Sequence, residues 1–217
     1  MEIATPDLNH RIASRVRELR AQRGLALDAL AAQCGVSRSM LSLIERGESS
    51  PTAVVLEKVA TGLGVTLASL FDPPAGAAAQ PEPVARRADQ ALWRDPSSGY
   101  VRRNVSPPGM PSPLRIVEVE FPAGARVAYE TGARFPRVHQ QIWVLAGRID
   151  VTLGAASHRL EAGDCFAMLL DQAMAYHNPG PAPARYAVVI ATEPGGTTAN
   201  PTAIPHLPPS SMARVQP

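Results

Sequence analysis

The chain has 217 residues, of which 45% are hydrophobic and 18% are charged, and its formal net charge is +2 at pH 7. This composition indicates a mostly folded protein that is long enough for two small domains. We expect a cytoplasmic protein, because the sequence has no run of about eighteen apolar residues and its start lacks the apolar segment of a secretory signal. The small net charge does not by itself indicate a nucleic-acid-binding protein.

The two cysteines, Cys34 and Cys165, are far apart in the sequence. A disulfide framework or a cysteine-based zinc site is not expected, because both need clustered cysteines. We expect two partly buried thiols that pack as small hydrophobic groups. A redox sensor is the alternative.

Changes in composition divide the chain into four parts. Residues 8–72 are rich in Leu, Ala, Arg and Glu, with apolar residues at helical spacing. Residues 73–90 are rich in Pro and Ala, which predicts a semi-extended linker. Residues 91–192 carry β-branched runs that Gly and Pro interrupt, which is typical of strands. Residues 193–217 are expected to form a disordered tail.

Within residues 8–72 the pattern predicts five short helices. The first buries Ile12, Val16 and Leu19 on one face and ends at Gly24, and the second repeats this spacing from Leu27. The fourth begins after Thr52 and the fifth covers residues 67–71.

The turn between the second and third helices carries the most specific signal. Gly35 supplies a tight turn, Ser37 is a suitable N-cap, and the third helix continues to about Arg46, where Gly47 ends it. The stretch Leu25 to Gly47, LALDALAAQCGVSRSMLSLIERG, resembles the Cro/repressor-type (XRE) helix-turn-helix family, and the match covers roughly residues 8–72. This resemblance implies that the third helix enters the major groove of DNA. The alternative is a plain helical bundle whose polar face is solvated.

The third helix supplies the candidate DNA contacts. Arg38 is placed to make a bidentate contact with guanine, and Ser39 and Ser42 to reach bases or phosphates. Glu45 would be repelled by phosphate, so we expect it to pair with an arginine of the first helix, such as Arg17. The predicted DNA-binding residues are Ser37, Arg38, Ser39, Ser42, Arg46 and Ser49.

One feature departs from the family pattern. Many relatives have a polar residue, often Gln, at the start of the second helix, where it contacts the DNA backbone. Here this position falls in the apolar run Leu25-Ala26-Leu27. Backbone contact through the second helix is therefore not expected.

The second half reads as a set of short strands. Ile149, Val151 and Leu153 alternate with polar residues, which indicates one buried and one wet face. Residues 100–191 resemble the cupin family through three short motifs: WVLAG at Trp143–Gly147, LEAGD at Leu160–Asp164, and His177-Asn178 followed by an AVVI strand. The predicted fold is therefore α+β and multidomain, with a five-helix helix-turn-helix bundle joined by a linker to an antiparallel β-barrel of the cupin, jelly-roll type.

The metal site that the cupin resemblance implies is missing from the sequence. Cupin enzymes usually bind a metal through two His and a Glu, with a third His later in the chain. Here the Glu position falls on Gln140, the third His position falls on Met174, and residues 133–136 contain no histidine. An amide and a thioether suit such a metal poorly. We therefore expect no metal, no cofactor and no catalytic residue.

Several polar groups remain where the ligands would lie, and we expect them to line a small-molecule effector pocket. The predicted pocket residues are Tyr129, Arg134, His139, Gln140, Met174 and His177, and Arg134 suggests an anionic effector. A filled barrel that serves only dimerisation is the alternative, and a displaced metal site using His139 and His177 is another.

Together these patterns predict a homodimeric transcriptional regulator that binds a double-stranded DNA operator and dimerises through its cupin half. The first alternative is a metal-dependent cupin enzyme, a dioxygenase or isomerase, with a DNA-binding appendage. The second is a protein-interaction adaptor with a degenerate helix-turn-helix.

Overall fold

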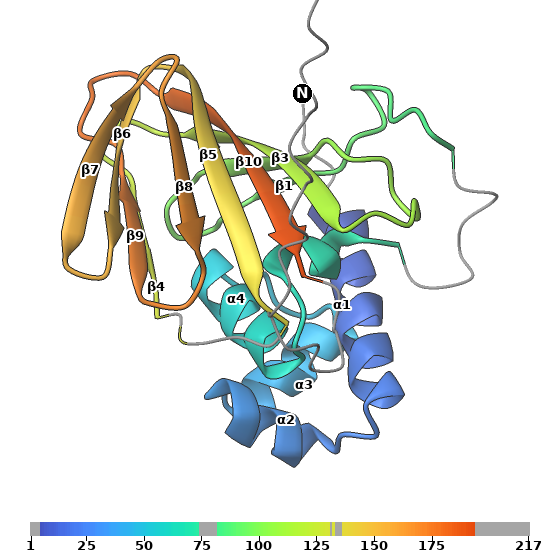
Figure 1. The fold of residues 1–217 in the computed structure, drawn as a ribbon. Helices are drawn as coiled ribbons and strands as arrows, with labels where there is room; N and C mark the ends of the chain where they lie inside the picture. Colours follow the sequence, from blue (N-terminus) through green and yellow to red (C-terminus); the bar gives the residue numbers. More distant parts are fainter. Residues whose placement is uncertain (1–4, 74–81, 131, 133–135, 194–217) are drawn as a thin grey trace, which may run out of the picture.

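The computed structural model describes residues 5–73, 82–130, 132 and 136–193 (Figure 1). Its first part is helical and its second part consists of strands. None of the described helices is long and apolar enough to cross a lipid bilayer. The helical elements are α1 (Thr5–Gln22), α2 (Leu27–Cys34), α3 (Arg38–Arg46), α4 (Ala53–Gly62) and the 3₁₀ helix η1 (Leu67–Phe71).

The predicted helix boundaries are confirmed at the turn. Gly35 and Gly47 follow α2 and α3 with φ of +63° and +73°, a conformation that glycine adopts without strain. The Ser37 hydroxyl accepts a hydrogen bond from the Met40 backbone N–H at 3.2 Å and so caps α3. Thr52 caps α4 in the same way, through the Val55 N–H.

The prediction of a fifth α-helix is wrong. Residues 67–71 form a 3₁₀ turn, in which the Ser69 N–H bonds to the Thr66 carbonyl three residues earlier. The segment is too short for two α-helical turns, and Leu67, Leu70 and Phe71 bury it against neighbouring elements. The helical part therefore has four α-helices among the described residues.

The strands form two antiparallel sheets that pack face to face. The six-stranded sheet has the order β1-β2-β3-β10-β5-β8 and the four-stranded sheet the order β4-β9-β6-β7. The strands are β1 (Leu92–Arg94), β2 (Val101–Asn104), β3 (Leu114–Phe121), β4 (Arg126–Tyr129), β5 (Val138–Ala146), β6 (Arg148–Leu153), β7 (Ala156–Glu161), β8 (Cys165–Leu169), β9 (Met174–His177) and β10 (Ala184–Thr192).

The expected closed barrel is not found. No backbone ladder joins the two sheets among the described strands, so the domain is a two-sheet sandwich whose edges stay open. The expected alternation is confirmed in β6, where Ile149 and Val151 are fully buried. In β10, Tyr186, Val188 and Ile190 point inward with the same period of two.

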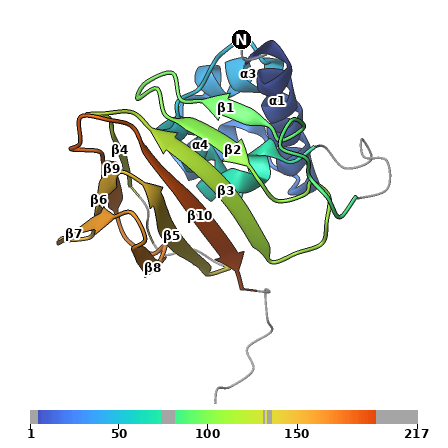
Figure 2. The same cartoon turned by 90° about the horizontal axis from the view of Figure 1, so that it is seen from above.

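The helical part and the sandwich pack directly on each other. β1 and β2 lie on the helical side of the six-stranded sheet (Figure 2), and α4 and η1 lie next to the strands while α2 lies toward the far end (Figure 1). The Phe71 ring of η1 meets the Trp93 ring of β1 edge-on, with 5.6 Å between ring centroids. One continuous cluster of buried apolar residues runs through both parts. The extent of the linker, predicted as residues 73–90, stays a prediction, since residues 74–81 lie outside the described ones.

Asp95, just after β1, joins the two parts by a hydrogen bond. Its carboxylate accepts from the Ala53 N–H at the start of α4, at 2.8 Å, and from the N–H and hydroxyl of Ser98. Only 2% of Asp95 is exposed. A residue of the β domain therefore caps a helix of the helical domain.

Replacing Asp95 with alanine is expected to lower the free energy of unfolding by about 2 kcal/mol, because the buried Ala53 N–H loses its acceptor. Urea denaturation followed by circular dichroism measures this loss. Asp171→Ala, at an exposed position of the same domain, is the control and should leave the midpoint unchanged. Equal stability of the two variants would contradict the capping role.

Candidate nucleic-acid interface and ligand cavity

Helix α3 divides cleanly into a buried and an exposed face. Leu41 and Ile44 are almost fully buried in the helical core. The opposite face carries polar side chains, and Met40, with 36% of its surface exposed, is the largest apolar group on it. The exposed residues at the start of this face and at its end are Ser37, Arg38, Ser39 and Arg46, all of them predicted DNA contacts.

Among the described residues, a surface ion pair is the only contact that holds the Arg38 side chain. Its Nε lies 2.9 Å from the Asp28 Oδ1 of α2, and the two side chains are 66% and 75% exposed. Exposed pairs of this kind contribute little to stability. Arg38 can therefore exchange Asp28 for another acceptor without an appreciable loss of stability.

The end of α3 is less open than its start. The Arg46 guanidinium donates to the Ser42 hydroxyl and also lies 2.8 Å from the Glu48 carboxylate. Ser42 is half-buried. The Ser49 hydroxyl oxygen is enclosed and has no hydrogen-bond partner in the described part of the chain. The Ser49 side chain is therefore enclosed rather than presented on the exposed face, and its contact with DNA stays a prediction.

Glu45 fixes α3 to α1, as expected, but through a different arginine. Both carboxylate oxygens of Glu45 accept from Arg20, at 2.6 Å from Nε and 2.8 Å from Nη2. Arg17, the expected partner, instead donates to the Glu45 backbone carbonyl. Arg20 lies one helical turn nearer the end of α1, where its side chain also reaches the Leu25 carbonyl at 2.8 Å. The bidentate pair turns the acid away from the exposed face of α3.

The start of α2 has no polar anchor. Ala26 stands at the N-cap and no side chain caps the helix there. This is the apolar position at which the sequence departs from the family pattern. The described geometry offers no side-chain donor for a phosphate at this position.

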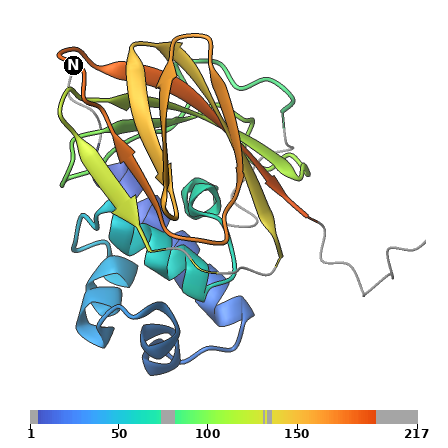
Figure 3. The same cartoon turned by 60° about the vertical axis from the view of Figure 1, so that its left-hand side comes forward.

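The second site is a cavity of about 70 Å³ inside the sandwich. The helical part closes one end of the sandwich (Figure 3), where Glu57 of α4 and Thr66 and Leu67 line the cavity. Its other lining residues are Tyr100, Arg102, Val119, Phe121, Val127, Tyr129, Gln140, Leu170, Met174, Tyr176, Tyr186, Val188 and Ile190.

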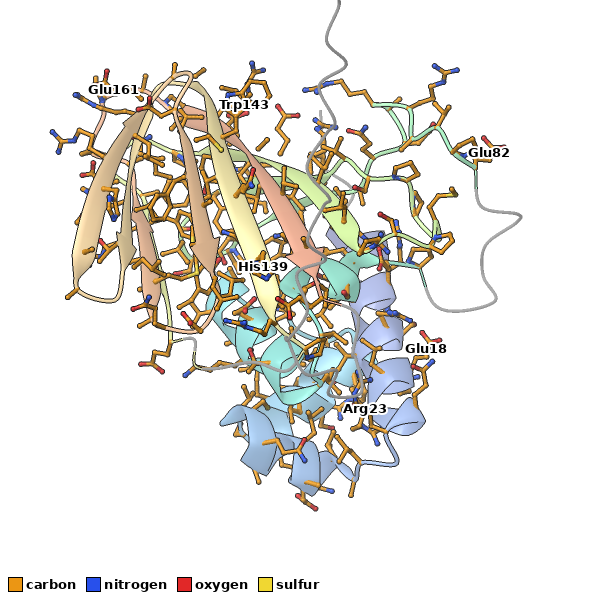
Figure 4. The ribbon with its side chains drawn as sticks, in the orientation of Figure 1. Glu18, Arg23, Glu82, His139, Trp143 and Glu161 are labelled. Carbon is orange, nitrogen blue, oxygen red and sulfur yellow. The ribbon has the colours of Figure 1, made fainter. Side chains whose placement is uncertain are left out.

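Three of the six predicted pocket residues line this cavity, namely Tyr129, Gln140 and Met174. His139 and His177 do not. Successive side chains of a strand point to opposite faces, so His139 cannot face inward beside Gln140, nor His177 three places after Met174. His139 lies on the outer face, 2.7 Å from Glu193, and His177 is 3.9 Å from Asp150 (Figure 4 labels His139). Arg134 lies outside the described residues.

Six polar lining residues were missed from the sequence, Glu57 and Thr66 in the helical part and four in the β domain. Tyr100 and Arg102 precede the first cupin motif, and Tyr176 and Tyr186 lie within β9 and β10, whose inward positions were not assigned. Period-two alternation was the available signal, because Tyr176 shares the face of Met174, and Arg102 shares that of Tyr100. For Arg102 this signal alone is ambiguous, since an isolated arginine in a strand usually marks the wet face.

The tyrosines of the cavity are neutral donors. Burial raises the pKa of Tyr129 and Tyr186 well above the ordinary value, and it raises the pKa of Tyr100 and Tyr176 as well. The Gln140 amide donates to the Tyr176 hydroxyl at 2.6 Å. All four phenols therefore keep their protons at neutral pH.

The cavity residues do not fit the cupin metal. Gln140 presents its amide nitrogen to Tyr176, and Met174 contributes a thioether, neither of which suits a divalent ion of that kind. No group of three His, Cys, Asp or Glu side chains is placed to hold an ion within the residues that the structure describes. The two cysteines are free thiols, and the expectation of two partly buried groups is wrong for Cys165, which is exposed, whereas Cys34 is buried.

Comparisons with known proteins match this geometry. Residues 16–70 match the helix-turn-helix family HTH_3. The HTH-type transcriptional regulator SutR of Escherichia coli is 27% identical over 78% of this chain and 88% of its own length. The control protein C.MunI of a Mycoplasma species is 36% identical over 30% of this chain and 89% of its own length. A crystal structure of an HTH_3 family transcriptional regulator from Vibrio cholerae superposes with a TM-score of 0.70, 27% identity, and coverage of 88% of this chain and all of the other.

The match to C.MunI covers 66 residues, whereas the matches to SutR and to the Vibrio cholerae regulator cover so much of the chain that they extend beyond the helical part into the strands. The two-sheet domain carries the motifs of the cupin resemblance in the expected order. The chain therefore belongs to the XRE-type helix-turn-helix family of transcriptional regulators, and its C-terminal two-sheet domain keeps the motifs of the cupin resemblance.

Proposed function

We propose that this protein is a homodimeric, sequence-specific transcriptional regulator that reads its operator with α3 and responds to a small molecule bound in the sandwich. The exposed start of α3, with Arg38 at its first turn, carries the proposal. An arginine at this place can donate two hydrogen bonds to the O6 and N7 atoms of guanine in the major groove. The Ser37 and Ser39 hydroxyls lie beside the helix N-terminus, where phosphate binding is favoured.

Arg38→Ala is expected to reduce discrimination between operator and unrelated DNA by about 10- to 100-fold, because one bidentate base contact is lost. The operator is first obtained by selecting bound sequences from a random DNA pool. Fluorescence anisotropy at a fixed salt concentration then gives the affinity for both DNAs.

Arg159→Ala is the matched control for this experiment. Arg159 also has an exposed side chain, 60%, and its Nε also lies 2.9 Å from an aspartate, Asp150, but on the four-stranded sheet. This variant should keep full selectivity. Full selectivity of Arg38→Ala would show that α3 does not read bases through this residue.

The outer face of the six-stranded sheet is the surface we propose for dimerisation. Trp143 is 52% exposed near one end of β5 (Figure 4), and the register places Ala187 of β10 and Cys165 of β8 on either side of it. Ile116 and Leu114 of β3 add exposed apolar area to the same face. Exposed apolar patches of this kind mark interaction sites.

A second copy of the chain is the occupant we propose for this face. A helix-turn-helix head makes few contacts alone, and regulators of this type bind two half-sites as symmetric dimers. The same face carries Glu118, whose carboxylate is already paired within the chain, 3.2 Å from Arg87 and 3.8 Å from Arg103 and from Arg185.

A further inference from the structure

Arg102 is a buried cation that forms no direct ion pair within the described residues, although the Asp72 carboxylate lies within electrostatic range of it. It belongs to β2, only 6% of its surface is exposed, and its Nη2 atom is enclosed without a hydrogen-bond partner. Its Nε donates to the Asn104 side-chain oxygen at 3.3 Å, and its guanidinium carbon lies 5.2 Å from the centre of the Phe71 ring. No carboxylate forms an ion pair with it within the described residues. A charge held in this way is costly, because neither the amide nor the ring replaces its lost hydration.

Arg102 lines the cavity of the sandwich together with further unused donors. The Tyr176 hydroxyl accepts from Gln140, and its own proton has no acceptor in the described part of the chain. Tyr186 stacks on Tyr176, with 6.1 Å between ring centroids and 8° between planes, and its hydroxyl has no partner there either. One cation and two phenolic donors therefore converge on a space whose other walls are largely apolar.

The size of the cavity limits what can enter. One water needs about 10–15 Å³ of such space, so the cavity, at about 70 Å³, accommodates roughly five non-hydrogen atoms. Glu57 of α4 lines the same cavity, and its carboxylate repels negative charge in its own vicinity. An anion is therefore best placed at the Arg102 side, with the rest of the molecule among the apolar and aromatic walls.

We propose that Arg102 anchors a small carboxylate in this cavity and that this carboxylate is the effector class of the regulator. The role of the carboxylate as an effector rests on the proposed function, whereas the binding site itself is inferred from the geometry of the cavity. Arg102 packs on Phe71 of η1, so a ligand that engages the guanidinium acts directly on the contact between the two domains.

The test uses the full chain without DNA and propionate as the probe, with propionamide as its neutral counterpart of equal size. Propionate at saturating concentration is expected to raise the melting temperature by about 3 °C or more over sodium chloride of equal ionic strength. Propionamide should give no shift. Arg102→Met, which keeps most of the side-chain volume, should fold as the wild type does by circular dichroism and lose the response to propionate.

Two further arms keep the test decisive. Tyr186→Phe removes one donor but keeps the ring, and it should weaken propionate binding by about 3- to 10-fold in calorimetry. This variant tests the site independently if Arg102→Met does not fold. Sulfate distinguishes a site for inorganic oxyanions, since a shift with sulfate and none with propionate would overturn the carboxylate assignment.

The proposal is also overturned if acetate, propionate and pyruvate all behave as sodium chloride does, or if Arg102→Met keeps the full shift. If propionate binds through Arg102 and operator affinity does not change, the cavity is a carboxylate site and the effector role fails. Loss of DNA selectivity in Arg38→Ala is measured separately, so the two failures can be told apart.

Discussion

Trp143→Glu is expected to convert the protein from a dimer to a monomer and to weaken operator binding at least about 100-fold. A carboxylate at the centre of the proposed interface would be buried without a partner on both sides of the twofold axis. The loss of operator affinity follows because two linked heads bind one operator about 10²–10⁴ times more tightly than one head. The variant should still fold, because Trp143 is 52% exposed and does not belong to the buried core.

Sedimentation velocity at micromolar concentration measures the oligomeric state of this variant, and anisotropy measures its operator affinity. Val84→Glu is the control, since Val84 is 51% exposed and belongs to the segment before β1 rather than to a strand of the sheet. Trp143 fluorescence gives an independent readout, because the second tryptophan, Trp93, is buried at 3% exposure and should not respond to dilution. A dimeric Trp143→Glu, or a monomeric wild type, would contradict the proposed interface.

Glu45→Ala is expected to lower the free energy of unfolding by about 3 kcal/mol and to weaken operator binding at the same time. Removal of the acid leaves Arg20 partly buried without its two carboxylate contacts, and breaking one partner of a buried pair typically costs about 3–5 kcal/mol. The side chains are 21% and 9% exposed, so solvent screens the loss only in part. Helix α3 also loses its attachment to α1, which misplaces Arg38 on the DNA.

Urea denaturation and operator anisotropy check both effects. Glu48→Ala is the control, because Glu48 pairs with Arg46 at the surface, and it should change stability little. The double variant Arg20→Met with Glu45→Leu should recover much of the lost stability, since an apolar pair of similar volume needs no counter-charge. A Glu45→Ala protein as stable as the wild type would show that the Arg20–Glu45 pair does not contribute to the free energy of unfolding.

The helical half was predictable because its signals are local. The spacing of Ile12, Val16 and Leu19, the turn glycines and the Ser37 cap each act within one or two helical turns, and the structure confirms them. The error at residues 67–71 has the same origin. Leu67 and Leu70, at i and i+3, share a face in an α-helix and in a 3₁₀ turn, so this spacing in a five-residue segment does not distinguish the two.

In the β half, the sequence determined strand positions and the face of many residues, but not the sites. Alternation places the Gln140 side chain on the inner face and the His139 side chain on the outer face. This assignment requires that one continuous strand contains both residues, as β5 does. The separation of the two sheets, by contrast, depends on ladders between strands far apart in the chain, such as β3 with β10. No local pattern records whether such ladders close into a barrel.

The helix-turn-helix, from which DNA binding is predicted, was thus determined by the local sequence from Leu27 to Arg46. The tertiary structure alone decided which arginine holds Glu45, that Asp95 of the β domain caps α4, and that Arg102 is buried beside the cavity. Each of these depends on contacts between residues 25 or more positions apart, where the free energy of burial and of hydrogen bonding is set by the packed chain and not by neighbours in sequence.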